Sequence, residues 1–141
     1  MKQGSRLRSV VVACAIALTP VLTASAQLPP GAVGGRTTFG TYCASCHGSA
    51  AKGDGTLAGM MNPRPPDLTL IMKRAGGAFP AERVARTIDG RTPAKGHGNS
   101  EMPVWGDAFS RTTDGSDAAV QARIAALVRY LESIQRRNAQ D

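Results

Sequence analysis

The sequence predicts an all-α fold of about four short helices that enclose a buried non-protein group. The clearest helical pattern lies near the C-terminus, where apolar side chains recur at spacings of four and three: Val120, Ile124, Leu127, Leu131 and Ile134. No segment alternates polar and apolar residues as a half-buried strand would. Aromatic residues make up only 4% of the chain. A domain of roughly 115 residues with so few aromatics would gain apolar mass from a prosthetic group.

The composition, with 42% hydrophobic and 19% charged residues, is that of a globular protein rather than a disordered or membrane-embedded one. Residues 1–26 have the parts of a secretory signal peptide: a basic start, an apolar stretch and the A-x-A cleavage site Ala24-Ser25-Ala26. We therefore expect Gln27 to be the mature N-terminus and the protein to be periplasmic. The alternative is that the segment is retained as an anchor, although its apolar run is too short to span a membrane as a helix.

Two further consequences follow from a cleaved signal peptide. Cys14 superficially resembles the lipidated cysteine of a lipoprotein, but the apolar stretch before it is too short, so we expect it to be removed with the signal. Cleavage would also remove Lys2, Arg6 and Arg8 but no acidic residue, so the formal net charge falls from +7 to +4. The mature protein is then mildly basic.

The stretch Cys43-Ala44-Ser45-Cys46-His47 is a C-x-x-C-H motif. Two thiols at this spacing can add across the two vinyl groups of a haem, and the adjacent histidine then becomes an axial ligand of the iron. Such capture also prevents the disulfide that an oxidising compartment would otherwise form. The alternatives are a thioredoxin-like redox pair or half of a zinc site. Neither is favoured, because the chain has no second cysteine pair and no βαβ pattern.

The segment before this motif predicts the first helix. Residues 27–34 are rich in Pro and Gly and form a flexible lead-in, so the domain is assigned to residues 35–141. Gly35, Phe39 and Cys43 recur every four residues and share one face of a helix. We expect Gly35 and Phe39 to pack against Leu127 and Tyr130 of the C-terminal helix.

The segment after the motif contains a loop, a rigid extended run and two short helices. Gly48–Gly55 is a glycine-rich loop, and residues 62–67 contain three prolines. The far N–H of a ligand histidine usually donates to a carbonyl, and Pro65 or Pro66 would supply it, unless this run is only a surface turn. Helices are predicted over 68–75, stopped by Gly76-Gly77, and over 81–89, capped by Gly90.

The opposite axial ligand is assigned to Met102. It is followed by a proline of fixed φ in a loop that can cross the haem, and a thioether is a soft ligand for haem iron. Met60 and Met61 lie too close to the attachment motif to cross to the other side of the haem. Met72 lies in an apolar helical run, where a methionine usually fills the core. His97, between two glycines, is the competing ligand. Trp105 would cover the ring and point its indole N–H toward a propionate.

The C-terminal part of the domain comprises a connector and the last helix. Residues 107–115 contain one large apolar side chain, Phe109, and are predicted to be irregular. Ser116 and Asp117 are good capping residues for the helix that follows.

Four motifs together resemble the small bacterial class I c-type cytochromes: Gly35-x-x-x-Phe39, Cys43-x-x-Cys46-His47, Met102-Pro103-x-Trp105 and Leu127-x-x-Tyr130. The resemblance covers residues 35–136. It implies an all-α cytochrome c fold wrapped around one haem, with crossing N- and C-terminal helices. It also implies a role for each site residue: thioether bonds at Cys43 and Cys46, axial ligation by His47 and Met102, orientation of His47 by Pro65 or Pro66, and propionate contacts by Arg91 and Trp105.

The function implied is single-electron transfer by an iron that cycles between Fe(II) and Fe(III), with no catalytic residue. The alternatives are a haem enzyme of peroxidase or nitrogen-oxide chemistry, with a displaceable sixth ligand beside His97 and Glu101, and an electron-entry subunit of a dehydrogenase or oxidase complex. Expected partners are redox proteins with acidic docking surfaces, steered by exposed basic residues: Lys52, Arg64, Lys73, Arg74 and Lys95. We expect no nucleic acid, and membrane contact only through a partner complex or an uncleaved signal.

Overall fold

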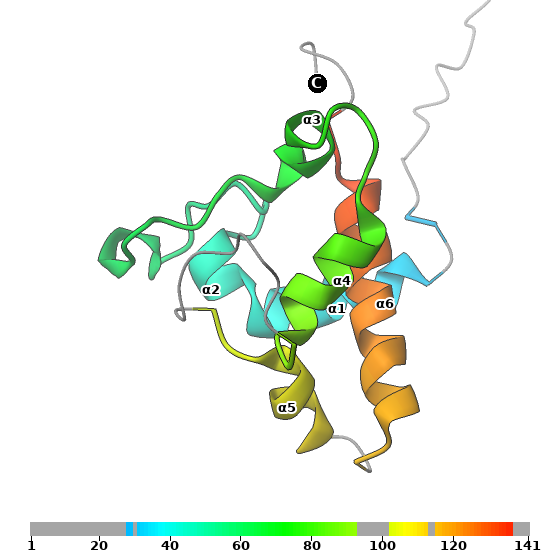
Figure 1. Ribbon diagram of the computed structural model, residues 1–141. Coiled ribbons are helices and arrows are strands. Elements are labelled where there is room, and N and C mark those ends of the chain that lie inside the picture. Colours follow the sequence, from blue (N-terminus) through cyan, green and yellow to red (C-terminus); the bar gives the residue numbers. More distant parts are fainter. Residues whose placement is uncertain (1–27, 30, 93–101, 113–114, 137–141) are drawn as a thin grey trace, which may run out of the picture.

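The computed structural model describes residues 28–29, 31–92, 102–112 and 115–136, and these ranges contain helices and no strands. The predicted all-α class is confirmed. The helices, with two short 3₁₀ turns labelled η, follow in the order α1 (Ala32–Tyr42), α2 (Ala44–His47), η1 (Ala58–Met60), η2 (Leu68–Leu70), α3 (Ile71–Arg74), α4 (Ala81–Asp89), α5 (Trp105–Ser110) and α6 (Asp117–Ser133) (Figure 1).

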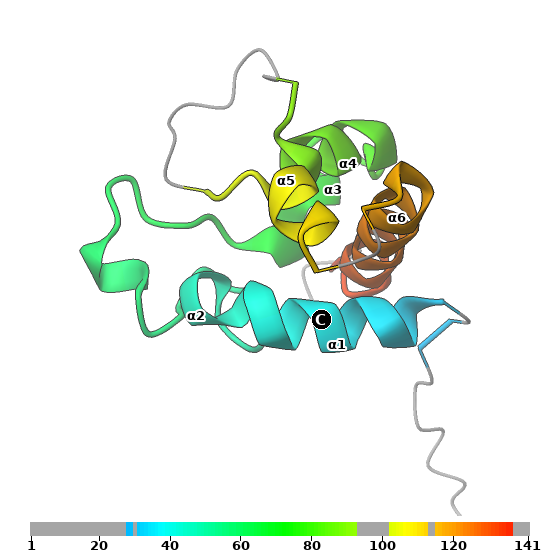
Figure 2. The same cartoon turned by 90° about the horizontal axis from the view of Figure 1, so that it is seen from below.

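Helices α1 and α6 cross and pack against each other, as predicted (Figures 1 and 2). Phe39 is 2% exposed, and its ring lies 5.3 Å from that of Tyr130, measured between centroids. A Cβ atom on Gly35 would collide with the carbonyl oxygen of Ala126. A glycine at this position therefore allows the two helix backbones to touch.

Helix α1 begins earlier than the sequence indicated. It starts at Ala32, whose side chain is completely buried, so the last three residues of the predicted lead-in belong to the fold. The sequence did not reveal this start, because the first helical turn contains the pair Gly34-Gly35 and follows a segment rich in Pro and Gly.

Helix α4 matches its prediction closely. Val84 and Ile88 are buried, and Gly90 ends the helix with a φ of 69°, the left-handed conformation that glycine adopts without strain. The predicted helix over 68–75 is instead two short pieces, η2 and α3, that meet at Leu70.

Two short helices were not predicted. Helix α2 contains the end of the C-x-x-C-H motif, and α5 lies in the segment that was expected to be an irregular connector. With four and six residues, neither is long enough to show a helical repeat in the sequence. Phe109 of α5 is 1% exposed, so this segment contributes to the core.

Helix α6 forms most of the core face. Its buried residues include those predicted from the spacing, Val120, Ile124, Leu127 and Leu131. Ser116 is the N-cap, and its hydroxyl accepts a hydrogen bond from the N–H of Ala119 at 3.4 Å. Within the described ranges no helix has the length and apolar character needed to cross a membrane.

Candidate haem site

The C-x-x-C-H motif lies at a tight junction between two helices. Cys43 ends α1 and precedes α2, and its carbonyl accepts hydrogen bonds from the N–H groups of Cys46 (3.2 Å) and His47 (2.9 Å). Both cysteines are free, half-buried thiols. Burial, and to a lesser extent the neighbouring Cys46, raises the pKa of Cys43 to about 12. One short turn thus presents two thiols and an imidazole, which is the donor set that covalent haem attachment requires.

The glycine-rich loop after the motif covers the C-terminal end of α2. The carbonyls of Cys46 and His47 accept hydrogen bonds from the N–H groups of Gly55 (3.2 Å) and Gly53 (2.8 Å) in this loop, and the carbonyl of Ser45 accepts one from the N–H of Leu57 (2.9 Å) just after it. These are the carbonyls that a helix end leaves without partners inside the helix. The loop therefore stabilises the turn that carries both cysteines and the histidine.

One ring nitrogen of His47, Nδ1, is buried without a hydrogen-bond partner among the described residues. Burial lowers the pKa of His47, and the backbone of Pro66 opposes this by raising it; the net pKa is lowered. A lowered pKa favours the neutral imidazole, the form that binds a metal. Pro66 thus lies close enough to act on His47, and its role as the orienting acceptor remains a prediction.

Met102 and Trp105 come from a segment far along the chain, at the start of α5. Met102 is half-buried and packs against the hydrophobic core. In Figure 2 the yellow segment that leads into α5 is separated from α1 and α2. The Met102 thioether is an available soft donor of the kind that haem iron accepts, and its ligation of iron remains a prediction.

An aromatic cluster joins these two segments. Tyr42, the residue before Cys43, contacts Trp105 edge-on, with ring centroids 5.6 Å apart. Phe109 completes the cluster, 5.6 Å from Tyr42 and 5.4 Å from Trp105. The attachment motif and the Met102 segment are therefore held together by side-chain packing. The predicted contact between Trp105 and a propionate is not tested by this arrangement.

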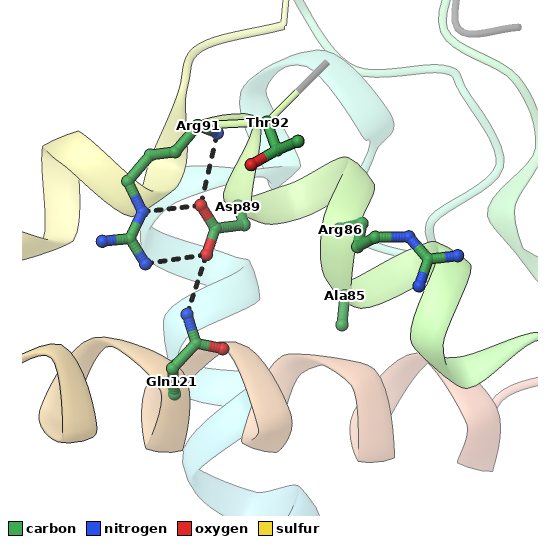
Figure 3. A pocket seen from close by; sticks show the side chains of 6 residues that line it. All are labelled: Ala85, Arg86, Asp89, Arg91, Thr92 and Gln121. Carbon is green, nitrogen blue, oxygen red and sulfur yellow. Dashed lines mark hydrogen bonds and ion pairs between the residues drawn. The ribbon is translucent and has the colours of Figure 1, made fainter. Parts of the chain in front are cut away.

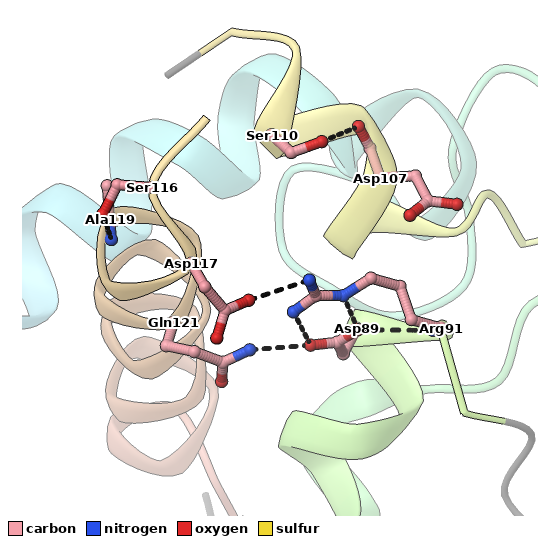
Figure 4. A network of polar contacts seen from close by, with 8 residues as sticks. All are labelled: Asp89, Arg91, Asp107, Ser110, Ser116, Asp117, Ala119 and Gln121. Carbon is pink, nitrogen blue, oxygen red and sulfur yellow. Dashed lines mark hydrogen bonds and ion pairs between the residues drawn. The ribbon is translucent and has the colours of Figure 1, made fainter. Parts of the chain in front are cut away.

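Arg91 lies in a different network, at a surface cleft of about 410 Å³ between α4 and α6 (Figure 3). Its guanidinium donates to both carboxylate oxygens of Asp89, from Nε (2.7 Å) and Nη2 (2.9 Å), and its Nη1 pairs with Asp117 at 2.8 Å (Figure 4). Gln121 donates to Asp89 as well, at 2.8 Å. The hydrogen bonds from Arg91 are the main reason that the pKa of Asp89 falls to about 2.

This network connects three helices. A Cβ atom on Gly106 would collide with Asp89 and Arg91, so the first turn of α5 packs directly on the ion pair. Arg91 therefore has a structural role between α4, α5 and α6 that the sequence did not reveal. Its predicted contact with a propionate would have to use the N–H groups that the two carboxylates leave free, and it stays a prediction.

Several residues singled out from the sequence cannot be placed. The signal segment with Cys14, and the loop residues Lys95, His97 and Glu101, lie outside the described residues. Of the methionines not chosen as ligand, Met60 is 78% exposed and Met72 is half-buried. In the part of the chain that the structure describes, no three His, Cys, Asp or Glu side chains gather as a metal site.

Two features of the site were missed. The position of Tyr42 beside Cys43 gave no signal, because its partner Trp105 is distant in sequence. The second feature, the buried Gln135, did leave a signal in the sequence. It lies four residues after Leu131 and so continues the buried face of α6. A polar residue on an apolar face indicates a specific partner.

Comparison with known proteins assigns the family. No curated protein and no solved structure matches the chain. A protein-family model described as Cytochrome c matches residues 32–135, which is more than half of the chain and extends from α1 through α6. This family binds haem c covalently and supports haem-based electron transfer, and Cys43 and Cys46 have the spacing of its attachment cysteines. The helical fold, the two free thiols beside His47 and the family match agree: the chain belongs to the Cytochrome c family.

Proposed function

We propose that this protein is an exported carrier of single electrons in the periplasm, with His47 and Met102 as the two axial ligands of its haem. The observation that carries the proposal is the contact between Tyr42 and Trp105. Tyr42 directly precedes the attachment motif, and Trp105 follows Met102 by three residues. Packing between them brings the segment that carries one proposed ligand to the segment that carries the other.

The chain contributes the residues that would attach the haem and bind its iron. When bound, haem c supplies the Fe(II)/Fe(III) couple. Cys43 and Cys46 would hold the haem by thioether bonds, and the His47 imidazole would bind the iron. Met102 would supply a thioether as the second ligand, which would favour Fe(II) relative to a second histidine. With both ligands bound, no position on the iron would remain for a substrate, which favours electron transfer over catalysis.

The proposed partners are redox proteins with acidic docking surfaces. Lys52, Arg64, Lys73 and Arg74 are exposed, and none of these four carries a described ion pair. Exposed positive charge of this kind accelerates association with an acidic partner and makes it sensitive to salt. The partner is either a diffusing protein or a complex at the membrane.

The proposal is tested on the full chain, expressed in a host that exports it and attaches haem. Mass spectrometry should show a chain that begins at Gln27 and carries one haem. A redox titration should be reversible with one electron per molecule, and the reduced protein should not bind carbon monoxide at neutral pH. Ready binding of carbon monoxide would contradict the carrier function and favour the haem enzyme. A mature chain without haem would overturn the proposal altogether, and a mass that includes residues 1–26 would contradict cleavage.

A further inference from the structure

Gln135 is a buried amide that joins the end of α6 to the segment after Pro66. It is 8% exposed, and its Oε1 accepts the N–H of Met72 at 2.8 Å. Its Nε2 donates both hydrogens, one to the carbonyl of Leu68 (2.8 Å) and one to that of Leu131 (2.7 Å). A buried amide costs free energy unless it is paired, and every N–H of this one is used. The side chain is therefore a specific connector.

A second set of bonds joins the same two segments. The N–H of Arg136 donates to the carbonyl of Thr69 at 3.0 Å, and its Nη2 lies 3.2 Å from Oδ2 of Asp67. The other carboxylate oxygen of Asp67 accepts both the N–H (2.9 Å) and the hydroxyl (2.6 Å) of Thr69, which is 6% exposed. Asp67, Thr69, Gln135 and Arg136, here called the α6 network, thus hold residues 67–72 against the end of α6.

The same segment is held on its other side by the loop that follows His47. The N–H of Leu68 donates to the carbonyl of the fully buried Ala51 at 2.7 Å. Gly53, whose N–H donates to the carbonyl of His47 at 2.8 Å, is so close to the carbonyl of Pro65 that a Cβ atom would collide with it. Residues 65–69 are therefore fixed between the loop that follows His47 and the end of α6, and Pro66 lies within this fixed stretch.

We propose that the α6 network is a positioning device for the axial histidine: it holds the Pro66 carbonyl as the acceptor for the buried Nδ1–H of His47 and so sets the strength of the histidine–iron bond. Asp67 follows Pro66 directly, so a shift of the Asp67 backbone also shifts that carbonyl. A hydrogen bond to the far N–H makes a ligand imidazole more basic and stabilises Fe(III). The inference rests on the proposed ligation by His47 and adds a means by which α6 tunes it.

The test uses the haem-loaded protein and two variants that weaken the network without touching His47 or Pro66. Gln135→Leu removes the connecting amide, and Thr69→Val removes the hydroxyl that donates to Asp67 with little change of shape. Two quantities are measured: the proton chemical shift of His47 Nδ1–H in the reduced, diamagnetic protein, and the reduction potential. We expect the proton resonance to move upfield and the potential to rise in both variants. Thr69→Ser, which keeps a hydroxyl, should restore both quantities toward those of the native protein.

The matched control is Val128→Ala, which changes a buried apolar residue of α6 outside the network. It should lower the midpoint of thermal unfolding while leaving the proton shift and the potential unchanged. If Gln135→Leu and Thr69→Val also lower only the unfolding midpoint, the network is merely structural and the inference is overturned. If the native protein lacks the ring-current shifts of an iron-bound His47, the proposed ligation and this inference are both overturned.

Discussion

Gly35 is the residue at which the backbones of α1 and α6 touch. A Cβ atom there would collide with the carbonyl oxygen of Ala126 and lie 2.9 Å from Cβ of Tyr130. The neighbouring glycine, Gly34, faces open space, since a Cβ atom on it would meet none of the described residues within 4 Å. Only Gly35 is therefore needed for the helix contact, and alanine substitution at each of the two positions distinguishes their roles.

We expect Gly35→Ala to lower the free energy of unfolding by ~1–3 kcal/mol, because backbone cannot move aside as a flexible side chain would. Gly34→Ala is the matched control. It should stabilise the protein by up to ~1 kcal/mol, since alanine is the better helix former and meets no neighbour. Urea unfolding of the two haem-loaded variants measures both effects. Equal stability of the two variants would mean that α1 and α6 do not touch at Gly35.

The sequence predicted some of these residue contacts and not others, for a physical reason. The contact of Gly35 and Phe39 with α6 follows from the helical repeat, which determines the side chains that share a face. The contacts of Tyr42 with Trp105, and of Arg91 with Asp117, depend on how loops bring distant segments together, and no local repeat encodes that. The propionate role of Arg91 came from the family resemblance and stays a prediction, whereas its bonds to Asp89 and Asp117 could not be recognised from the sequence.

At the scale of elements, α5 is held on two sides. Its first turn packs on the Asp89–Arg91 pair at Gly106, and its aromatic residues pack on Tyr42 of α1. Since Met102 lies just before α5, both contacts bear on the position of the proposed sixth ligand. The helix was missed in the sequence because six residues are less than two turns. The longer α4 and α6, with nine and 17 residues, were found because each carries apolar residues at helical spacing.

The aromatic contact of α5 with Tyr42 predicts the effect of Tyr42→Leu. The substitution keeps an apolar side chain but removes two edge-to-face aromatic contacts, each worth ~0.5–1.5 kcal/mol beyond burial. We expect unfolding to become easier by ~1–3 kcal/mol and the proposed Met102–iron bond to weaken. Tyr42→Phe, which keeps the ring, is the control and should match the native protein. A Tyr42→Leu variant with native behaviour would show that the cluster does not secure the Met102 segment.

The contact of α5 with the Asp89–Arg91 pair predicts a pH dependence. The pKa of Asp89 is lowered from its ordinary 3.8 to about 2 by its bonds to Arg91 and Gln121, so the ionised form stabilises the folded state. That stabilisation is complete above pH 3.8 and is lost as the pH falls toward 2. Asp89→Asn should therefore be less stable than the native protein at neutral pH, by roughly 1–3 kcal/mol. The difference should shrink through this acid window.

The control for Asp89 is Asp107→Asn, at an exposed position on α5. The Asp107→Asn variant keeps Asp89 and every other acid-sensitive group of the protein, including the proposed ligand histidine. Its stability should therefore depend on pH as that of the native protein does. Thermal unfolding from neutral pH down to the acid window measures all three proteins. A deficit of Asp89→Asn that stays constant with pH would show that the charge of Asp89 does not carry the stabilisation.

At the scale of the whole molecule, the crossed α1 and α6 form the frame, and the site segments lie between them in the chain. The core consists mainly of residues of these two helices with α4 and Phe109. The overall class could be predicted because the helical repeats and the C-x-x-C-H motif are local patterns. The polar networks that join the ends of the helices could not, since each unites residues more than thirty positions apart, as Gln121 does with Asp89.

The exposed basic residues predict how the whole protein meets its partner. Electron transfer to an acidic redox protein should slow as ionic strength rises, because salt screens the steering charges. The double variant Lys73→Gln with Arg74→Gln, both on α3, should weaken this salt dependence. Arg83→Gln, an exposed charge on α4, is the control. Stopped-flow kinetics at several salt concentrations measures the effect. If the rate constant depends equally on salt in the native protein, the double variant and Arg83→Gln, the partner does not dock at Lys73 and Arg74.

The central claim is that one haem is bound covalently at Cys43 and Cys46 with His47 and Met102 on opposite sides of the iron. The most direct measurement is the absorption spectrum of the oxidised, haem-loaded protein compared with that of Met102→Ala. We expect the native protein to show the Met-to-iron charge-transfer band. Met102→Ala should lose this band, keep its covalent haem and have a lower reduction potential. A band that survives in Met102→Ala, or is absent from the native protein, would contradict the account.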